Sequence, residues 1–204
     1  MPTIYDLKPR FQNLLRPLVR RLAAAGATAN QVTVAAALLS LAAAAAVAAL
    51  AGSRTSLLIY PLLLFVRMAL NAVDGMLARE HGQKSRLGAI LNETGDVVSD
   101  AALYLALIPA LAPYGAAAPP ILAFAFLAVL TEFVGVLGQT IGGGRRYDGP
   151  MGKSDRAAAV GVVAFLIAIG VPGGQWLDIA FTLLAALALL TSWRRGRSAL
   201  EGGS

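Results

Sequence analysis

The sequence has no cysteine and few charged residues, and both absences restrict what the protein can be. Without cysteine, neither a disulfide framework nor a thiolate site can form. Only 14% of the 204 residues are charged, whereas 57% are hydrophobic, a balance typical of membrane proteins. The formal net charge is +6, but the basic residues lie between apolar runs instead of forming one basic face. This distribution argues against nucleic-acid binding.

Long apolar runs indicate six membrane-spanning helices, because a helix needs roughly 20 apolar residues to cross a bilayer. They lie near residues 31–51, 56–78, 88–112, 117–142, 157–172 and 175–193. We therefore expect an all-α integral membrane protein with six transmembrane helices over residues 31–195. An N-terminal interfacial helix and entry segment over residues 1–30 precedes them, and residues 196–204 form a tail that we expect to be disordered.

The N-terminal segment and the basic residues predict how the chain meets the membrane. Residues 4–23 carry apolar side chains at helical spacing with arginines between them, which is typical of an amphipathic helix in the membrane plane. A cytosolic packing helix is the alternative. Lysine and arginine gather in the N-terminal segment, within 79–86 and 145–156, and after the last span. The positive-inside rule therefore places both termini and these two connections in the cytoplasm.

Polar residues gather along one side of the second span and one side of the third. An α-helix turns about 100° per residue, so one stripe of the second span contains Arg67, Asn71, Asp74, Gly75 and Ala78. The small residues of this stripe leave room for close approach of a backbone or a ligand. The third span has a similar stripe with Glu93 at its edge, formed by Gly88, Asn92, Asp96 and Asp100. A short connection should bring the two stripes together.

Two interpretations of these stripes differ in their chemistry. Carboxylates inside a membrane are costly unless they are paired or bind a ligand. A set of internal ion pairs, such as Arg67 with Asp74, would satisfy them. Several oxygen ligands with few basic partners at that depth suit a hard cation better, and Mg²⁺ and Mn²⁺ prefer oxygen ligands.

The spacing across both stripes resembles the signature of the CDP-alcohol phosphatidyltransferases, D-x-x-D-G-x-x-A-R-x8-G-x-x-x-D-x-x-x-D. Every spacing matches, and this chain reads Asn71-x-x-Asp74-Gly75-x-x-Ala78-Arg79, then eight residues, then Gly88-x-x-x-Asn92-x-x-x-Asp96. The two departures are asparagines in place of the first and third aspartates. The segment 26–33 also resembles the family's entry to its first span, and Gly152-Lys153 resembles its glycine–lysine turn. The resemblance covers roughly residues 10–195.

The resemblance implies a membrane enzyme of phospholipid biosynthesis. The family transfers a phosphatidyl, or other substituted phosphoryl, group from a CDP-linked donor to an alcohol and releases CMP. The donor is usually CDP-diacylglycerol. Two divalent cations, Mg²⁺ or Mn²⁺, lie on the donor pyrophosphate. The resemblance also implies a homodimer, and we expect it in the bacterial inner (plasma) membrane with its active site facing the cytoplasm.

Residue roles follow by the same resemblance. The metal site would contain Asn71, Asp74, Asn92 and Asp96, and Asp96 would also act as the catalytic base. The nucleotide and donor would contact Asn30, Gly75, Ala78, Arg79 and Gly88. The acceptor would contact Lys153, Arg145 and Arg146. Membrane lipid headgroups are the alternative partners of the two arginines.

The two amides change the charge of the expected metal site. Asparagine can bind a cation through its carbonyl oxygen but contributes no negative charge. We hypothesise a working but altered site in which Glu93, Asp100 or both restore part of the missing charge.

Other interpretations stay open. A catalytically silent family member would bind the CDP-lipid or a partner without turnover. An intramembrane prenyltransferase or a transporter would also carry acids within the membrane. Gly152-Lys153-Ser154 does not form a P-loop, because Tyr147 stands where that motif needs glycine. The acceptor alcohol is not specified, and glycerol phosphate, inositol, inositol phosphate, serine and other polyols remain candidates.

Overall fold

The computed structural model describes residues 8–142 and 144–201, and the regular structure in these two ranges is entirely helical. The elements are α1 (Lys8–Ala24), α2 (Ala29–Ala49), α3 (Arg54–Glu80), α4 (Arg86–Leu111), the 3-10 turn η2 (Ala112–Tyr114), α5 (Ala118–Thr140), α6 (Lys153–Ala168) and α7 (Gln175–Glu201). Five of the described helices, α2 to α5 and α7, are long and apolar enough to cross a membrane. The predicted all-α membrane fold is confirmed. The predicted number of six spans stays a prediction, because α6 has only 16 residues.

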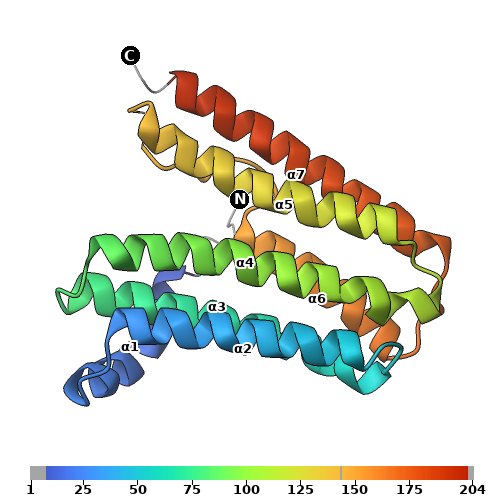
Figure 1. Cartoon of the computed structure of the whole chain (residues 1–204), viewed down its shortest axis with the longest axis horizontal. Coiled ribbons are helices and arrows are strands. Elements are labelled where there is room, and N and C mark those ends of the chain that lie inside the picture. The colour runs from blue at the N-terminus through green and yellow to red at the C-terminus, as the bar shows by residue number, and fades with distance from the viewer. Residues whose placement is uncertain (1–7, 143, 202–204) are drawn as a thin grey trace.

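The helices form two connected groups. The helix α2 packs against both α3 and α4, while α6 packs against α3 and α5 packs against α4. The helix α5 also pairs along its length with α7, as Figure 1 shows. The N-terminal ends of α2 and α4 and the C-terminal ends of α3, α5 and α7 point to one side of the molecule, where α1 also lies (Figure 1). The polar stripes of α3 and α4 therefore lie near the same end of the bundle.

Side-chain caps fix the helix ends on this side. Thr28 and Gln31 form a capping box at the start of α2, since each side chain accepts a hydrogen bond from the other's backbone N–H. Gln83, in the link between α3 and α4, accepts from Ala29 N at 2.6 Å and donates to Ala27 O at 3.2 Å. These bonds tie the α3–α4 link to the entry of α2.

The helix α1 covers residues 8–23 of the predicted interfacial helix, while residues 4–7 lie outside the described part of the chain. Its Val19 is fully buried, whereas Leu14 is 76% exposed. Arg16 donates two hydrogen bonds of 3.0 Å to Glu80 at the end of α3, and these bonds raise the pKa of the Arg16 guanidinium. The helix therefore has an attached face and a free apolar face, and its position in the membrane plane stays a prediction.

The last helix continues beyond the predicted boundary. We expected a disordered tail from residue 196, but α7 extends to Glu201. Ala199 is buried on this turn, at 4% exposure, and Arg197 pairs with Glu201 at i,i+4 spacing, 2.7 Å apart. Packing against α5 thus continues the helix through residues that carry no long apolar run.

The interior and the outer surface are both largely apolar. Aromatic side chains fill the centre, where the Tyr104 and Phe124 ring centroids lie 4.9 Å apart, and Tyr60 donates to Leu103 O at 2.9 Å. Large apolar side chains such as Leu38 and Phe126 are more than half exposed. This outward apolar surface suits contact with lipid.

Candidate functional site

The candidate site lies where the polar stripes of α3 and α4 face each other. Asn71 of α3 donates from Nδ2 to Asp96 Oδ1 of α4, at 2.7 Å. Asn92 lies one helical turn before Asp96 on α4 and is half-buried. The predicted register of both helices therefore brings the first and last positions of the motif into direct contact.

Asp74 occupies the deepest position of the motif, only 3% exposed. Its Oδ2 accepts a hydrogen bond of 2.7 Å from the Thr33 hydroxyl of α2. Its Oδ1 is buried and has no hydrogen-bond partner among the described residues. Asp74 also interacts electrostatically with Asp96 and Lys153. A buried carboxylate oxygen without a partner is costly, so this oxygen is suited to binding a ligand.

Basic groups surround Asp96. Arg67 of α3 donates to the Asp96 backbone oxygen at 3.1 Å and lies 3.4 Å from Asp96 Oδ1. Lys153, the first residue of α6, forms an ion pair with the same Oδ1. The contacts that the described residues make with this carboxylate all use Oδ1, so Oδ2 keeps lone pairs that could accept a proton.

A second cluster of charges lies deeper, between α4, α5 and α6. Arg156 is fully buried and pairs with Glu132 at 2.7 Å and with Asp100 at 3.3 Å. Asp100 also pairs with Arg67 at 2.7 Å, which joins this cluster to the candidate site. Arg195 of α7 donates to Thr131 O at 2.5 Å. The contacts of this cluster join α3, α4, α5 and α6, and Arg195 adds α7.

Ion pairing in the site is therefore extensive, although not in the form we suggested. Arg67 pairs with Asp96 and Asp100, not with Asp74. Glu93 pairs with Arg145, which also lies 3.2 Å from Glu132. Within the described residues, no three Asp, Glu or His side chains come together as a metal-binding group.

The residues expected to contact the donor lie around the helix ends. At Gly88 a Cβ atom would lie only 2.7 Å from Asn30 Oδ1, so the missing side chain lets Asn30 approach the backbone of α4. At Gly75 a Cβ atom would lie 3.1 Å from the Arg79 guanidinium, which folds back over α3. Ala78 is half-buried on the same face. These residues thus line one end of the stripe.

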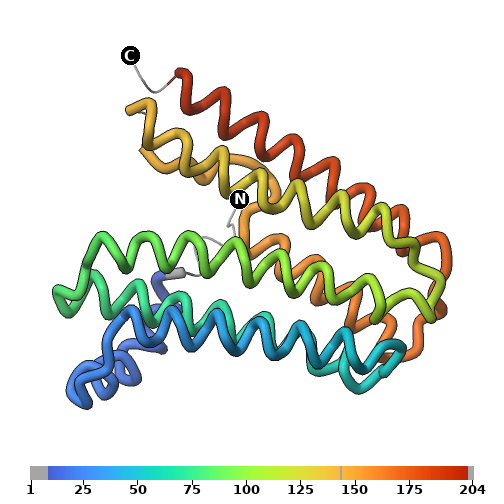
Figure 2. Tube along the Cα trace, in the orientation of Figure 1, coloured from blue at the N-terminus to red at the C-terminus, as the bar shows by residue number. Residues whose placement is uncertain are grey.

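The residues expected to contact the acceptor lie on the segment 144–152 and, for Lys153, at the start of α6. The segment runs back along α5 before α6 begins (Figure 2). Arg146 N donates to Gly135 O of α5 at 3.2 Å, and Met151 N donates to Thr191 Oγ1 of α7 at 3.0 Å. Gly149 has a φ of 110°, and a Cβ there would lie 2.6 Å from Thr191 Cγ2. The segment is thus held between α5 and α7, and Arg145 and Lys153 reach the acids of α4.

Several functional contacts were not predicted from the sequence. Thr33 holds Asp74, and its only signal was its place in the segment that resembles the family's first-span entry. Glu132 contacts three arginines, Arg145, Arg156 and Arg195, and no motif in the sequence points to these contacts. Arg156 and Arg195 were interpreted only as basic residues near the cytoplasmic ends. Their shared partner Glu132 lies 24 residues from Arg156 and 63 residues from Arg195 in the chain. Helical periodicity relates residues within one helix, so it does not predict such contacts between helices.

The donor set fits a hard divalent cation. Asp74 Oδ1 is buried and has no hydrogen-bond partner among the described residues, and the neighbouring motif residues add carboxylate and amide oxygens, which Mg²⁺ and Mn²⁺ accept as ligands. Asp74 Oδ1 would hold such an ion, with Asn71 about one turn away on α3, whereas Asp96 Oδ1 is already contacted by Asn71, Arg67 and Lys153.

A comparison with known protein families identifies the family of this chain. A family model described as CDP-alcohol phosphatidyltransferase matches residues 27–193. The chain belongs to this family. The match contains the whole candidate site, from Asn30 to Lys153. The five long apolar helices also fit an integral membrane protein.

Relatives in this family include proteins of bacteria and archaea. The chain is 48% identical to inner membrane protein YnbA of Escherichia coli (strain K12) over 198 residues, which cover 97% of this chain and 96% of that protein. It is 31% identical to archaetidylinositol phosphate synthase of Pyrococcus horikoshii over 97 residues, which cover 48% of this chain and 49% of that protein. The inner-membrane relative supports an integral location in a bacterial inner membrane.

Solved structures of the family share the fold. The phosphatidylinositol phosphate synthase of Mycobacterium tuberculosis in complex with manganese and citrate superposes with a TM-score of 0.72 and 22% identity, covering 90% of this chain and 88% of that chain. The same enzyme with CDP-DAG bound superposes with a TM-score of 0.67 and 22% identity, covering 90% and 92%. At this identity the likeness concerns the fold.

Proposed function

We propose that the chain transfers a phosphatidyl group from a CDP-linked donor, CDP-diacylglycerol, to an alcohol and releases CMP. The observation that carries this proposal is the hydrogen bond from Asn71 of α3 to Asp96 of α4, next to Asp74, whose buried Oδ1 has no hydrogen-bond partner among the described residues. Family membership supports the reaction class. A solved relative with the same fold binds CDP-DAG, and another structure of that relative contains manganese.

The reaction needs positioning, charge neutralisation and a base. The acceptor oxygen forms a new bond to the donor's β-phosphorus, and the bond from this phosphorus to the bridging oxygen breaks, so CMP leaves with that oxygen. Asp96 Oδ2 takes the proton of the acceptor hydroxyl. Arg67, Asn71 and Lys153 contact the other carboxylate oxygen, Oδ1, and thereby orient the carboxylate. Asp74 would hold a divalent cation, which when bound would supply charge neutralisation on the pyrophosphate.

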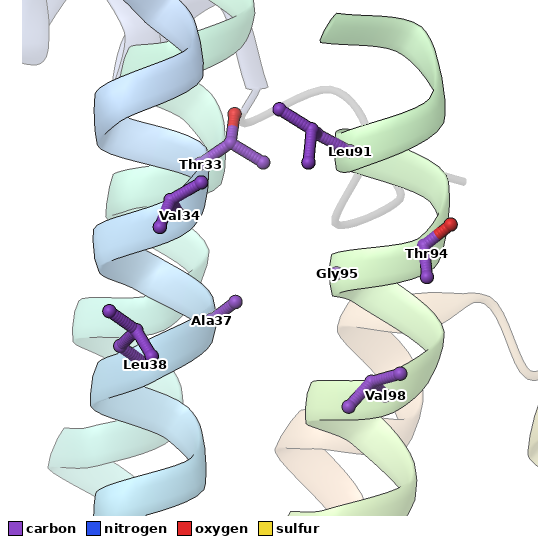
Figure 3. Close-up of a pocket in the computed structure, with 8 residues that line it drawn as sticks. All are labelled: Thr33, Val34, Ala37, Leu38, Leu91, Thr94, Gly95 and Val98. Atoms are coloured by element: carbon purple, nitrogen blue, oxygen red, sulfur yellow. The ribbon is translucent and has the colours of Figure 1, made fainter. Parts of the chain in front are cut away.

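An apolar groove beside the site suits an acyl chain of the donor. The groove lies between α2 and α4, has a volume of about 240 Å³, and is lined by Thr33, Val34, Ala37, Leu38, Leu91, Thr94, Gly95 and Val98 (Figure 3). Thr33 lines this groove and also holds Asp74. A lipid whose pyrophosphate lies at Asp74 could therefore place apolar atoms in the groove without leaving the membrane.

The acceptor is an alcohol that we place beside the segment 144–152. Lys153 and Arg145 already contact acids of α4, whereas Arg146 Nε is buried without a hydrogen-bond partner among the described residues. Arg146 is thus the cation of this segment that is best suited to a polar or anionic acceptor. A homodimer stays part of the proposal by family resemblance.

The experiment is a direct assay of both products. The purified protein is incubated with CDP-diacylglycerol, Mn²⁺ or Mg²⁺ and a panel of alcohols, including glycerol phosphate, inositol, inositol phosphate and serine. We expect one acceptor to give CMP and a new lipid in equal amounts. Binding of CDP without CMP release for every acceptor would instead identify a catalytically silent member, the alternative that Asn71 and Asn92 suggest.

A further inference from the structure

The family resemblance implies two divalent cations, but the donors around Asp96 are arranged differently from those around Asp74. Asp74 is 3% exposed and keeps one buried oxygen without a partner among the described residues. This oxygen offers one strong position for a cation. The number of cations therefore depends on whether Asp96 and its neighbours offer a second position.

Asn71 is a direct hydrogen-bond partner of Asp96, at a motif position where the family signature has a second acid. Two carboxylates at the Asn71 and Asp96 positions would repel each other and would require a cation between them. In this chain the Asn71 side chain turns its NH₂ group toward Asp96, and Nδ2 and Oδ1 lie 2.7 Å apart. The orientation follows from charge, because the amide oxygen would repel the carboxylate. The amide hydrogen bond thus does what a bridging cation would do.

Basic side chains complete the shell of Asp96. Lys153 pairs with the same Oδ1, and Arg67 lies 3.4 Å from it. The Lys153 ammonium is a compact positive charge with three hydrogen-bond donors, so it can neutralise the Asp96 carboxylate as a metal cation would. A second divalent cation would have to displace these groups and would meet their positive charge.

The neighbouring acids are not free to compensate for the amides. Glu93 pairs with Arg145, and Asp100 pairs with Arg67 and Arg156. Around the site, ion pairs among the described residues join four carboxylates, Glu93, Asp96, Asp100 and Glu132, to five cations, Arg67, Arg145, Lys153, Arg156 and Arg195. Asp74 forms no ion pair with them but interacts electrostatically with Lys153, and it brings the formal count to five carboxylates and five cations. The cluster is already neutral before any cation binds. This geometry does not favour the hypothesis that Glu93 or Asp100 restores the missing charge.

We propose that this chain binds a single divalent cation at Asp74, and that the Asn71 amide and the Lys153 ammonium replace the second cation around Asp96. The proposal rests on the proposed function, because the pyrophosphate of the donor completes the shell of the one cation. It makes Asn71 a residue that sets the metal content of the site.

Metal stoichiometry tests this proposal independently of turnover. Mn²⁺ is titrated into purified full-length protein with saturating CDP, and free Mn²⁺ is followed by electron paramagnetic resonance. We expect one bound Mn²⁺ per wild-type chain. Two bound ions, or none, would overturn the proposal. The wild-type result alone is decisive, so it does not depend on the folding of any variant.

Matched variants assign the effect to the amides. Asn71→Asp combined with Asn92→Asp restores the carboxylates of the family signature, and we expect two bound Mn²⁺ per chain. Asn13→Asp makes the same chemical change on α1, where Asn13 contacts Arg16, and should leave the number at one. A double variant that still binds one ion would overturn the role given to the amides.

Measuring CMP release in the same samples separates the two proposals. One bound Mn²⁺ without CMP release for any acceptor contradicts the proposed function and leaves the single-cation site standing. CMP release with two bound ions contradicts the single-cation site and leaves the function standing.

Discussion

Each buried acid of the candidate site has a polar or basic side chain as its partner. Asp74 contacts a hydroxyl, whereas Asp96 and Asp100 contact basic side chains from α3 and α6. Charged groups at this depth are tolerated only where each has a partner or faces a ligand. Because these partners lie on different helices, the polar site also stabilises the packing of the bundle.

Removal of Arg156 should destabilise the fold strongly. Arg156→Met leaves Asp100 and Glu132 with one buried partner fewer, and breaking a buried pair in this way costs about 3–5 kcal/mol. Thermal or denaturant unfolding in detergent measures the loss. Arg197→Met is the matched control, because Arg197 is largely exposed and its ion pair within the described residues is with Glu201 on its own helix, so we expect little change in stability. Equal stability of both variants would contradict this account of the buried cluster.

The sequence predicted the helical register of the motif residues but not most of their partners. A period of 3.6 residues places Asn71 and Asp74 on one face of α3 and Asn92 and Asp96 on one face of α4. The hydrogen bond between Asn71 and Asp96 follows from that register together with a short link. The pairing of Arg156 with Glu132 could not be predicted, because it depends on how α5 and α6 pack.

At the level of the elements, α2 and α4 form the groove that we assign to the donor's acyl chain. Gly95 lines this groove, and Gly95→Leu should fill it. We expect the KM for a long-chain CDP-diacylglycerol to rise roughly tenfold or more, as for the loss of about two buried CH₂ groups at ~0.8 kcal/mol each. A short-chain donor should be affected less. Steady-state kinetics with the two donors measures the difference.

Gly95→Ala is the control for this prediction. An added Cβ would lie 3.7 Å from Ala37 Cβ, which is ordinary van der Waals contact. We therefore expect its KM values to match those of the wild type. Identical kinetics for the leucine and alanine variants would remove the groove from the donor site.

The helix α5 positions the segment 144–152 through its glycines. A Cβ at Gly138 would lie 2.8 Å from Gly144 O, so Gly138→Ala should push the segment away from α5. Arg145 would then lose its contacts with Glu93 and Glu132. We expect the kcat/KM for the acceptor to fall about 10- to 100-fold, since small displacements of positioning groups have large effects. Kinetics with varied acceptor concentration measures it.

The matched control lies on the neighbouring helix. A Cβ at Gly196 of α7 would meet only Val134 Cγ1, at 3.8 Å. Gly196→Ala should therefore keep the wild-type kcat/KM, and alanine's better helix propensity should not harm stability. A loss of activity in this variant equal to that of Gly138→Ala would contradict the proposed role of the segment.

Element boundaries were predicted well where apolar runs end in polar caps, and less well elsewhere. The start of α4 is marked by Ser85, which accepts from Gly88 N at 2.9 Å. The end of α7 was misplaced, because it depends on tertiary packing of Ala199 and on no local signal. The short α6 begins at Lys153, inside a segment interpreted as a connection.

At the level of the whole molecule, the distribution of basic residues predicts that the site faces the cytoplasm. The helix ends next to the site all point to one side (Figure 1). A green fluorescent protein fused after the C-terminus should fluoresce in bacterial cells, while alkaline phosphatase at the same place should be inactive. The reverse pattern would contradict the predicted orientation. Alkaline phosphatase inserted at Gly52, between α2 and α3, should be active and serves as the control.

The central claim is that Asp96 acts as the base in phosphatidyl transfer from a CDP-linked donor. Its most direct test is CMP release by the wild type and Asp96→Asn, measured together with CDP-diacylglycerol and the acceptor identified from the panel. We expect release by the wild type and a loss of about 100-fold or more in the variant, as for a general base. Asp178→Asn, which keeps an oxygen to accept from Ala117 N, should retain wild-type release. Equal CMP release by the Asp96→Asn protein and the wild type would contradict the claim.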